Sequence, residues 1–290
     1  MKITVFSPTY NRAYIIENLY RSLQRQSCHD FEWLVVDDGS TDNTAELFTQ
    51  WMQEDNSFPI RYFRQENGGK CRAINRGLEL AEGELFFTVD SDDYLTDDAV
   101  EKVIAWEASL PQNQKYCGVA GNLGTSAEET PNYRIDGPYF DGSALDRYDR
   151  IDGERAMVFY TGVHRKYPYP AFQGEKFMTE AVTWNRMAHD GYRMRFYNDI
   201  IWVFEYKEDG LTRAGSRLFL DNPKGYGLWL REKAEFEHMS LPDRLRMYYT
   251  FTCDLSSLYT SRQIAEFIGA PCPLIAAFHT AHKLKHCIRK

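Results

Sequence analysis

Short apolar runs alternate with stretches of helical periodicity along the first 110 residues. Four runs have the length and composition of buried strands, at 3–7, 31–36, 60–64 and 84–89. Four segments place apolar residues on one side of a helix, at 13–26, 44–54, 70–81 and 97–110. Strands separated by helices of about ten or more residues predict an α/β fold with a mostly parallel sheet and right-handed crossovers.

The pattern changes after residue 120. Residues 121–154 are rich in Gly, Asp and Tyr and predict an irregular loop or hairpin segment. Helical periodicity returns at 175–189, and the apolar runs in 195–206 indicate one or two strands. From Asp221 the chain is charged and helical in character. We therefore expect a main domain at 1–218, with halves at 1–120 and 121–218, and a helical C-terminal extension at 219–290.

A polar cluster follows each predicted strand of the first half. These clusters are SPTYNR at 7–12, DDGST at 37–41, QENGGK at 65–70 and DSDD at 90–93. In an open parallel sheet, ligands bind beyond the carboxyl ends of the strands. The four clusters are therefore expected to share one rim of the sheet.

Composition narrows the class of protein. The 290 residues are 43% hydrophobic and 26% charged, as in ordinary globular proteins. The net charge of −8 argues against a general nucleic-acid binder, although residues 271–290 carry four basic residues and no acid. Six cysteines without a CxxC pair favour reduced thiols, and no signal peptide or membrane-spanning run is found. These features predict a cytoplasmic protein.

Three acids stand together in DSDD, directly after an apolar strand. Carboxylates at i and i+2 of an extended segment can bind one hard cation such as Mg²⁺ or Mn²⁺, which also keeps water and substrate phosphate in its shell. The alternative is a solvated turn in which Asp92 caps the next helix. The position of DSDD at the expected rim favours the metal.

Two other clusters supply candidate contacts to a nucleotide. In DDGST, Asp38 is placed to accept hydrogen bonds from a base or a ribose, whereas the alternative is a turn and helix cap. In SPTYNR, Pro8 restricts the backbone while Thr9 and Tyr10 supply a hydroxyl and a ring that can flank a base. The alternative for SPTYNR is an ordinary strand–helix loop.

Taken together and in this order, four segments resemble the N-terminal half of family-2 glycosyltransferases with the GT-A fold. They are ITVFSPTYNRAYIIENLYRSLQRQ, FEWLVVDDGSTDNT, ENGGKCRAINRGLELAEGE and FFTVDSDDYL. The resemblance covers residues 1–110 closely and 160–215 more loosely. It implies a nucleotide-binding sheet flanked by helices, a nucleotide-diphospho-sugar donor that is most often a UDP-sugar, a divalent metal (Mn²⁺ or Mg²⁺) and inversion of the anomeric centre.

The resemblance also implies site residues. Those expected to bind the nucleotide-sugar are Pro8, Thr9, Tyr10, Asp38, Lys70, Arg72, Asp90 and Ser91. Asp92, assisted by Asp93, is the implied metal ligand. A surface position at the start of a helix is the alternative for Lys70. The segment at 205–215 resembles the family's diphosphate loop, which assigns Thr212 and Arg213 to that loop.

Transfer by direct displacement needs a base that takes the proton of the acceptor hydroxyl. In the family this is commonly an acid at the start of a helix that contains Trp. Here Glu180 stands four residues before Trp184, on one helical face and on the acceptor side. The family's Glu-Asp pair is Thr179-Glu180 in this chain, which leaves Glu175 as a rival.

The last twenty residues combine an apolar lead with a basic end, as helices on anionic membrane surfaces do. The alternative is an ordinary terminal helix. His279, His282 and His286 fall near one helical face, but no neighbouring carboxylate or Cys is arranged with them for a zinc site. Residues 271–290 are therefore a candidate for peripheral contact with the inner face of the membrane.

The sequence predicts transfer of one sugar to a glycan or lipid-linked acceptor in cell-surface polysaccharide biosynthesis. The Gln-x-x-Arg-Trp motif and membrane helices of processive polymerases are absent. A sugar nucleotidyltransferase is a first alternative, but SPTYNRAY lacks the glycines of a triphosphate-binding loop. A non-catalytic glycan- or nucleotide-binding relative is the second. The sugar, the acceptor and the linkage stay open.

Overall fold

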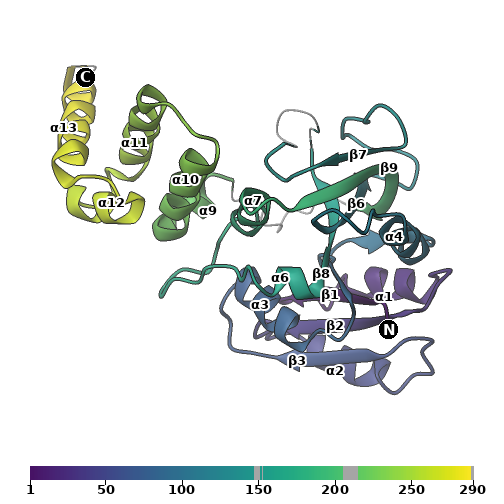
Figure 1. Ribbon diagram of the computed structural model, residues 1–290. Helices are drawn as coiled ribbons and strands as arrows, with labels where there is room; N and C mark the ends of the chain where they lie inside the picture. Colours follow the sequence, from purple (N-terminus) through teal and green to yellow (C-terminus); the bar gives the residue numbers. More distant parts are fainter. Residues whose placement is uncertain (147–150, 152, 205–214, 289–290) are drawn as a thin grey trace. The chain divides into compact units, whose positions relative to one another are not determined.

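The chain divides into two compact units in the computed structural model (Figure 1). The sheet unit comprises Met1–Tyr169 and Arg186–Lys207, and the helical unit comprises Pro170–Asn185 and Glu208–Lys290. The structure describes residues 1–146, 151, 153–204 and 215–288, with their side chains up to residue 285. Residues 170–185 group with the C-terminal helices. The domain boundaries expected at 120 and 218 stay a prediction.

One mixed sheet forms the centre of the sheet unit, in the order β3-β2-β1-β4-β8-β6-β9-β5, with β7 paired to β9. Its strands are β1 Ile3–Thr9, β2 Phe31–Asp37, β3 Ile60–Arg64, β4 Leu85–Thr88, β5 Tyr94–Leu95, β6 Tyr116–Gly124, β7 Tyr139–Gly142, β8 Arg155–Tyr160 and β9 Arg193–Val203. The neighbours among β3, β2, β1 and β4 are all parallel, as the alternating pattern predicts.

Both faces of this parallel half are covered, which explains why β1 and β2 are buried at every position. On one face, strand residues such as Val5 and Trp33 pack against apolar side chains of the first two helices. On the other face, Phe6 meets the third helix at Gly77, where an added Cβ would lie 2.2 Å from the Phe6 ring. The helices of the unit are α1 Glu17–Gln24, α2 Thr44–Trp51, α3 Lys70–Leu80, α4 Ala99–Ala108 and α6 Thr161–His164.

The irregular segment predicted at 121–154 is wrong in part. β6 continues through Gly124 and β7 covers 139–142. The glycines of β6 resemble those of a loop in composition, but in the structure they allow close packing and do not form turns. A Cβ at Gly118 would stand 1.9 Å from the carbonyl oxygen of Val158 in β8, and one at Gly121 would stand 2.6 Å from Ile201 in β9.

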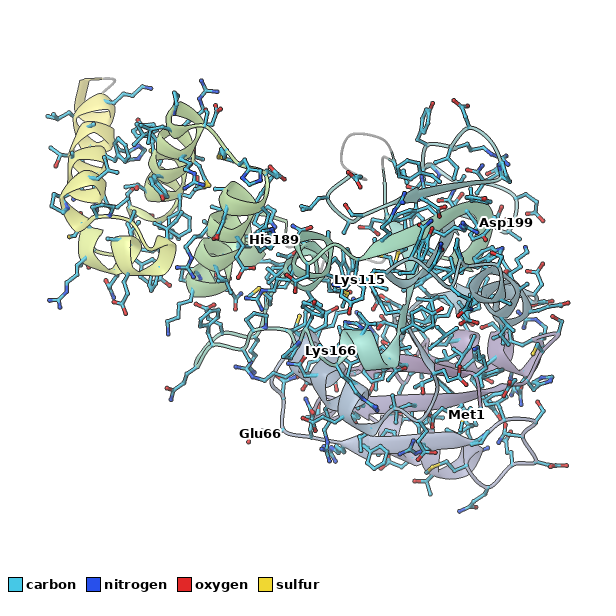
Figure 2. The ribbon with its side chains drawn as sticks, viewed as in Figure 1. Met1, Glu66, Lys115, Lys166, His189 and Asp199 are labelled. Carbon is cyan, nitrogen blue, oxygen red and sulfur yellow. The ribbon has the colours of Figure 1, made fainter. Side chains whose placement is uncertain are left out.

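The helical unit has its own core. Its long helices are α10 Pro223–Phe236, α11 Leu241–Leu255, α12 Ser261–Ile268 and α13 Cys272–Ile288, preceded by the short α9 Arg217–Leu220. Figure 2 draws the side chains of these helices as sticks. Six buried side chains of α11, α12 and α13 form the core of the unit: Phe251, Leu255, Ile264, Ala265, Ile268 and Ile275. The predicted helical extension is therefore a packed structure with a hydrophobic core.

The helix predicted at 175–189 begins later than expected. α7 runs over Ala181–His189, and residues 175–180 are not helical. The apolar period extends past the true start because Met178 is buried without being helical, at 4% exposure. This difference matters for the two acids of the segment, Glu175 and Glu180.

Candidate active site

The ends of β1, β2 and β4 meet at one edge of the sheet, as the parallel order predicts. Thr9 at the end of β1 pairs in register with Asp37 at the end of β2, and Phe6 pairs with Thr88 of β4. The amide of Asp38 donates to the carbonyl of Thr9 at 2.8 Å, which ties the first two loops together. The four predicted polar clusters therefore share one rim.

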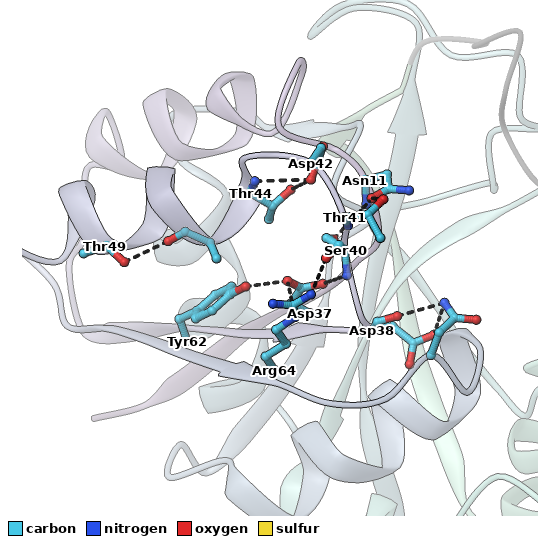
Figure 3. Close-up of polar contacts among 12 residues, drawn as sticks. Asn11, Asp37, Asp38, Ser40, Thr41, Asp42, Thr44, Thr49, Tyr62 and Arg64 are labelled. Carbon is cyan, nitrogen blue, oxygen red and sulfur yellow. Dashed lines mark hydrogen bonds and ion pairs between the residues drawn. The ribbon is translucent and has the colours of Figure 1, made fainter.

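Asp37 is fully buried at this rim and holds the DDGST turn (Figure 3). Its carboxylate accepts hydrogen bonds from the amide of Ser40 at 2.7 Å and from the hydroxyl of Tyr62. Burial, followed by the hydrogen bond to Asp37, raises the pKa of Tyr62. The Arg64 guanidinium completes the group by donating to the Ser40 carbonyl. The first acid of the motif is thus a structural residue.

Asp38, the second acid, organises the glycine loop that precedes α3. One of its oxygens accepts from Gln65 Nε2 at 2.7 Å and from the Gly68 amide at 2.9 Å. The other accepts from Asn67 Nδ2 at 3.2 Å and from the Gly69 amide at 2.7 Å. Four donors match the four acceptor sites of a carboxylate. The side chain, 4% exposed, is therefore occupied by its own loop.

The loop after β1 is attached to the DDGST turn through Asn11 (Figure 3). Asn11 has a positive φ of 54°, a conformation that Asn tolerates better than most residues. Its amide donates to Ser40 Oγ at 2.8 Å, and its side-chain oxygen accepts from the Thr41 amide at 2.7 Å. Although burial opposes it, hydrogen bonds from Thr44 and the Ala13 amide lower the pKa of Asp42. These contacts fix the direction of the residues that follow Asn11.

Two basic side chains reach the acids of DSDD. Lys70 Nζ lies 2.7 Å from Asp90 Oδ1, so this predicted donor-binding residue contacts the predicted acid. Arg12 Nη2 lies 3.7 Å from Asp92 Oδ2. Burial, followed by the charge of Asp90, raises the pKa of Asp92, while Arg12 and Lys70 act in the opposite direction. The negative charge at Asp92 is therefore only partly compensated by the protein.

Arg12 was not among the residues predicted for the site. In SPTYNR, the proline, the hydroxyl and the ring were predicted to serve the site, and the last residue was not. A basic residue in a strand-end loop opposite three acids was the available signal. What it could not show was the turn at Asn11, which directs the guanidinium toward Asp92.

Asp93 differs from its two neighbours because it is 9% exposed and faces the sheet. Its Oδ2 accepts a hydrogen bond of 2.8 Å from the indole nitrogen of Trp202 in β9. Its amide donates to the carbonyl of Asp90 at 3.2 Å and closes the DSDD turn. Asp93 therefore anchors the turn to β9, which fixes the position of Asp92.

The other predicted donor-site residues lie along the same rim. Thr9 is 3% exposed, and its hydroxyl has no hydrogen-bond partner within the described residues. Tyr10, by contrast, is 46% exposed. Arg72 donates to the carbonyl of Gly68 at 2.6 Å and so supports the glycine loop. Pro8 and Ser91 are buried.

The acids Asp90 and Asp92 suit a divalent metal by the chemistry of their donors. Mg²⁺ and Mn²⁺ bind oxygen, commonly through one or two carboxylates completed by water and substrate phosphates. Asp92, with its raised pKa, would gain from a cation. No group of three or more His, Cys, Asp or Glu in the described part of the chain could hold a metal ion by itself. A metal at this place would accordingly depend on phosphate oxygens for its remaining ligands.

In the helical unit, Glu175 and Glu180 have different surroundings. Glu175 is 7% exposed, and its two oxygens accept from the amides of Lys224 and Gly225 at 2.8 and 2.9 Å. The carbonyl of Glu180 accepts from the amides of Thr183 and Trp184, at the first turn of α7. Glu180 is partly exposed, as is Trp184 one turn later.

Two further predictions concern the end of the chain. Thr212 and Arg213 lie outside the described residues. His279 is buried in the helical unit, where its Nδ1 lies 2.9 Å from Ser261 Oγ and burial lowers its pKa. Within the described range, no helix has the length and apolar composition needed to cross a bilayer. Membrane contact at 271–290 stays a prediction.

Comparison with known proteins places these observations in a family. Residues 4–167 match the family described as Glycosyl transferase family 2. Glycosyltransferase GlyG of Streptococcus pneumoniae serotype 4 is 37% identical over 100 residues, which are 34% of this chain and 33% of that protein. The GalNAc(5)-diNAcBac-PP-undecaprenol beta-1,3-glucosyltransferase of Campylobacter jejuni is 27% identical over 211 residues, 71% of this chain and 60% of the relative. The matched regions thus span about a third to three fifths of these relatives.

A solved structure supports the fold. S. aureus TarS 1-349, in complex with UDP-GlcNAc, superposes with a TM-score of 0.64 at 16% identity, over 99% of this chain and 92% of that one. The GT-A fold with a helical C-terminal region, expected from the sequence, is confirmed.

Proposed function

This chain belongs to glycosyl transferase family 2, and we propose that it is a metal-dependent, inverting transferase that moves one sugar from a nucleotide-diphospho-sugar to an acceptor hydroxyl. One observation carries the proposal. Asp90 and Asp92 stand at the shared rim of the parallel strands with Lys70 and Arg12 beside them. Such a group of acids and bases is suited to a diphosphate and its cation.

The donor is expected to lie along the rim. Lys70 and Arg12 supply the positive charges that a diphosphate requires, and each can exchange its present carboxylate partner for a phosphate oxygen. The buried hydroxyl of Thr9 and the exposed ring of Tyr10 are placed to meet the nucleoside. Asp38 and Arg72 hold the glycine loop in position. Their part in binding the nucleotide base is therefore to support this loop.

Asp92, assisted by Asp90, is the residue that would hold Mn²⁺ or Mg²⁺. When bound, the metal would stabilise the charge of the departing diphosphate. Asp93 takes a supporting part, because one of its oxygens is engaged by Trp202. The raised pKa of Asp92 supports this assignment, since a cation relieves the repulsion from Asp90.

Glu180 is the proposed base. Its carboxylate accepts the proton of the acceptor hydroxyl while that oxygen forms a bond to the anomeric carbon and the bond from carbon to the donor diphosphate breaks. Attack opposite the leaving group inverts the anomeric centre. Glu175 is the weaker choice, because backbone amides occupy both of its oxygens. Trp184, one helical turn after Glu180, is proposed to contact the acceptor.

The acceptor is proposed to be a glycan or a lipid-linked glycan. The C. jejuni relative, which matches 71% of this chain, is named as a transferase that acts on an undecaprenol-linked glycan. The proposed donor is a UDP-sugar, because the similar TarS structure was solved with UDP-GlcNAc. A role in cell-surface polysaccharide biosynthesis follows from these two choices.

The test is a transfer assay with UDP-, GDP- and TDP-sugars, Mn²⁺ and undecaprenyl-linked glycans, in which release of nucleoside diphosphate is followed. Glu180→Gln is expected to bind the donor normally and to slow transfer about 10²-fold or more, since amides accept protons poorly. Glu266→Gln, at an exposed acid of α12, is the matched control and should transfer at the wild-type rate. Normal turnover by Glu180→Gln would remove the base assignment, and no turnover of any donor would contradict the proposed function.

A further inference from the structure

We propose that Glu175 and Asn222 are positioning residues for the base: they fasten the segment before Glu180 to the N-terminus of α10, so that the C-terminal helices determine where the base stands. The inference rests on the proposed function, because it takes Glu180 to be the base. It assigns to the helical unit a part in catalysis, as the support of the catalytic acid.

The contacts of Glu175 and Asn222 together form a clamp between residues 175–177 and the N-terminus of α10. Glu175 makes the first half of this clamp. Its Oε1 accepts from the amide of Lys224 and its Oε2 from the amide of Gly225, in the first turn of α10. The first amides of a helix have no partner within the helix, and a carboxylate there also gains from the helix dipole. Glu175 therefore caps α10 from a distance of 49 residues along the chain.

Asn222 makes the second half and points the other way. It is the residue before α10, and its Oδ1 accepts from the amides of Lys176 and Phe177 at 2.9 and 3.1 Å. Its Nδ2 donates to the carbonyl of Leu218 at 2.7 Å. Asn222 is 8% exposed, so all of these bonds are sheltered from water. Glu175 thus caps α10, and Asn222, the residue before α10, binds the backbone that follows Glu175.

Side-chain packing closes the same contact. The ring of Phe177 meets that of Phe219 edge to face, with centroids 5.4 Å apart. Met178 lies against Gly225, where an added Cβ would be 3.1 Å from the methionine methyl. The next residue but one is Glu180, whose carbonyl accepts hydrogen bonds from the amides of Thr183 and Trp184 in the first turn of α7. Between Met178 and α7, only Thr179 and Glu180 remain.

A further glycine fixes α10 itself. A Cβ at Gly227 would stand 2.2 Å from the carbonyl oxygen of Phe267 in α12, so α10 lies close against the helical core. Gly225 and Gly227 thus let one helix touch the clamped segment and α12 at short range. A displacement of α10 would therefore be transmitted to the segment that carries the base.

The experiment measures kinetics and hydrogen exchange in the full-length protein. The variants are Glu175→Gln, Asn222→Ala and Asn222→Asp, with Glu235→Gln at an exposed acid of α10 as the control. Glu175→Gln and Asn222→Ala should lower kcat about tenfold or more and leave the donor KM nearly unchanged, because a misplaced base slows chemistry and not donor binding. Asn222→Asp keeps the oxygen acceptor and should recover most of kcat.

Two readouts separate positioning from other roles. Amide exchange in a peptide covering 171–180 should quicken in Glu175→Gln and Asn222→Ala, while β2 is unchanged. The acidic limb of the pH–kcat profile should persist in Glu175→Gln and vanish in Glu180→Gln. Should Glu175→Gln fold poorly, Glu175→Asp tests the same contact with the charge kept.

Several outcomes would overturn the inference. Faster exchange with an unchanged kcat would show that the clamp does not place the base, and loss of the acidic limb in Glu175→Gln would make Glu175 itself the base. In both cases the wild-type protein still transfers sugar and the proposed function stands. An inactive wild-type protein would instead defeat the proposed function, and the positioning role with it.

Discussion

Asp92 of the sheet unit is half-buried and Glu175 of the helical unit is buried, yet the two carboxylates are held in opposite ways. Glu175 accepts hydrogen bonds from two backbone amides, at 2.8 and 2.9 Å. Asp92 has a guanidinium at 3.7 Å and a like charge, Asp90, as its neighbour. Backbone amides cannot leave, whereas a side-chain cation can be exchanged for a metal ion. The first arrangement builds structure and the second is open to a ligand.

Asp38 shows that location alone does not decide between these roles. It stands on the same rim as Asp92, but four donors of the glycine loop occupy its oxygens, as the α10 amides occupy those of Glu175. An acid of the DDGST motif therefore resembles the structural acid of the other unit more than it resembles its neighbours in DSDD. Three substitutions test this distinction.

The largest effect is expected from Asp92→Asn. Removing the proposed metal ligand should lower Mn²⁺-dependent transfer by about 10³-fold, since a metal supplies several kcal/mol of charge stabilisation. The same change removes a charge that the folded protein disfavours, so the thermal midpoint should not fall. Transfer kinetics and a thermal melt check the two parts, and an Asp92→Asn protein with normal Mn²⁺-dependent turnover would end the assignment.

Asp38→Asn is expected to act mainly on stability. The amide presents a donor where two loop donors need an acceptor, which should cost about 1–3 kcal/mol of unfolding free energy. Urea denaturation measures it, with the exposed Asp55→Asn as a control that should stay within about 0.5 kcal/mol. A stable Asp38→Asn protein that has lost only donor affinity would place Asp38 among the ligand-binding acids instead.

The smallest effect is expected from Arg12→Ala, as a shift in the pH dependence of Mn²⁺ binding. Burial and Asp90 raise the pKa of Asp92, so a proton competes with the cation at higher pH than at an ordinary Asp. Mn²⁺ affinity should fall as pH drops below that pKa, by about tenfold per unit for one proton. Arg12 lowers this pKa, so Arg12→Ala should move the onset of the fall to higher pH.

Titration of Mn²⁺ binding by calorimetry across pH tests this shift, and an onset moved to lower pH would contradict it. Linkage gives the matching sign for folding. With a pKa above its unfolded value, Asp92 binds its proton more tightly in the folded state, so its contribution to stability falls as pH rises through the window between the two values. Asp92→Asn should remove that contribution.

Much of the parallel half could be predicted from residues 1–110. Apolar runs and helical periods located β1 to β4 and their helices, because burial on both faces of a sheet leaves a local imprint on composition. Turn residues at each strand end located the rim, and the order of the four clusters indicated the family. Glycines that serve close packing, such as Gly121, have the composition of a loop, so the end of β6 was included in the irregular segment predicted at 121–154.

By itself, then, the sequence determined which acids were candidates for the active site. It also determined which strands would bring the acids of residues 1–110 to one edge of the sheet. Only the tertiary structure decided how each acid is held. The partners of Glu175 lie 49 and 50 residues away, and the guanidinium that reaches Asp92 comes from the loop after another strand. The charge state and the availability of a carboxylate depend on its neighbours in space, and periodicity along a chain contains no record of them.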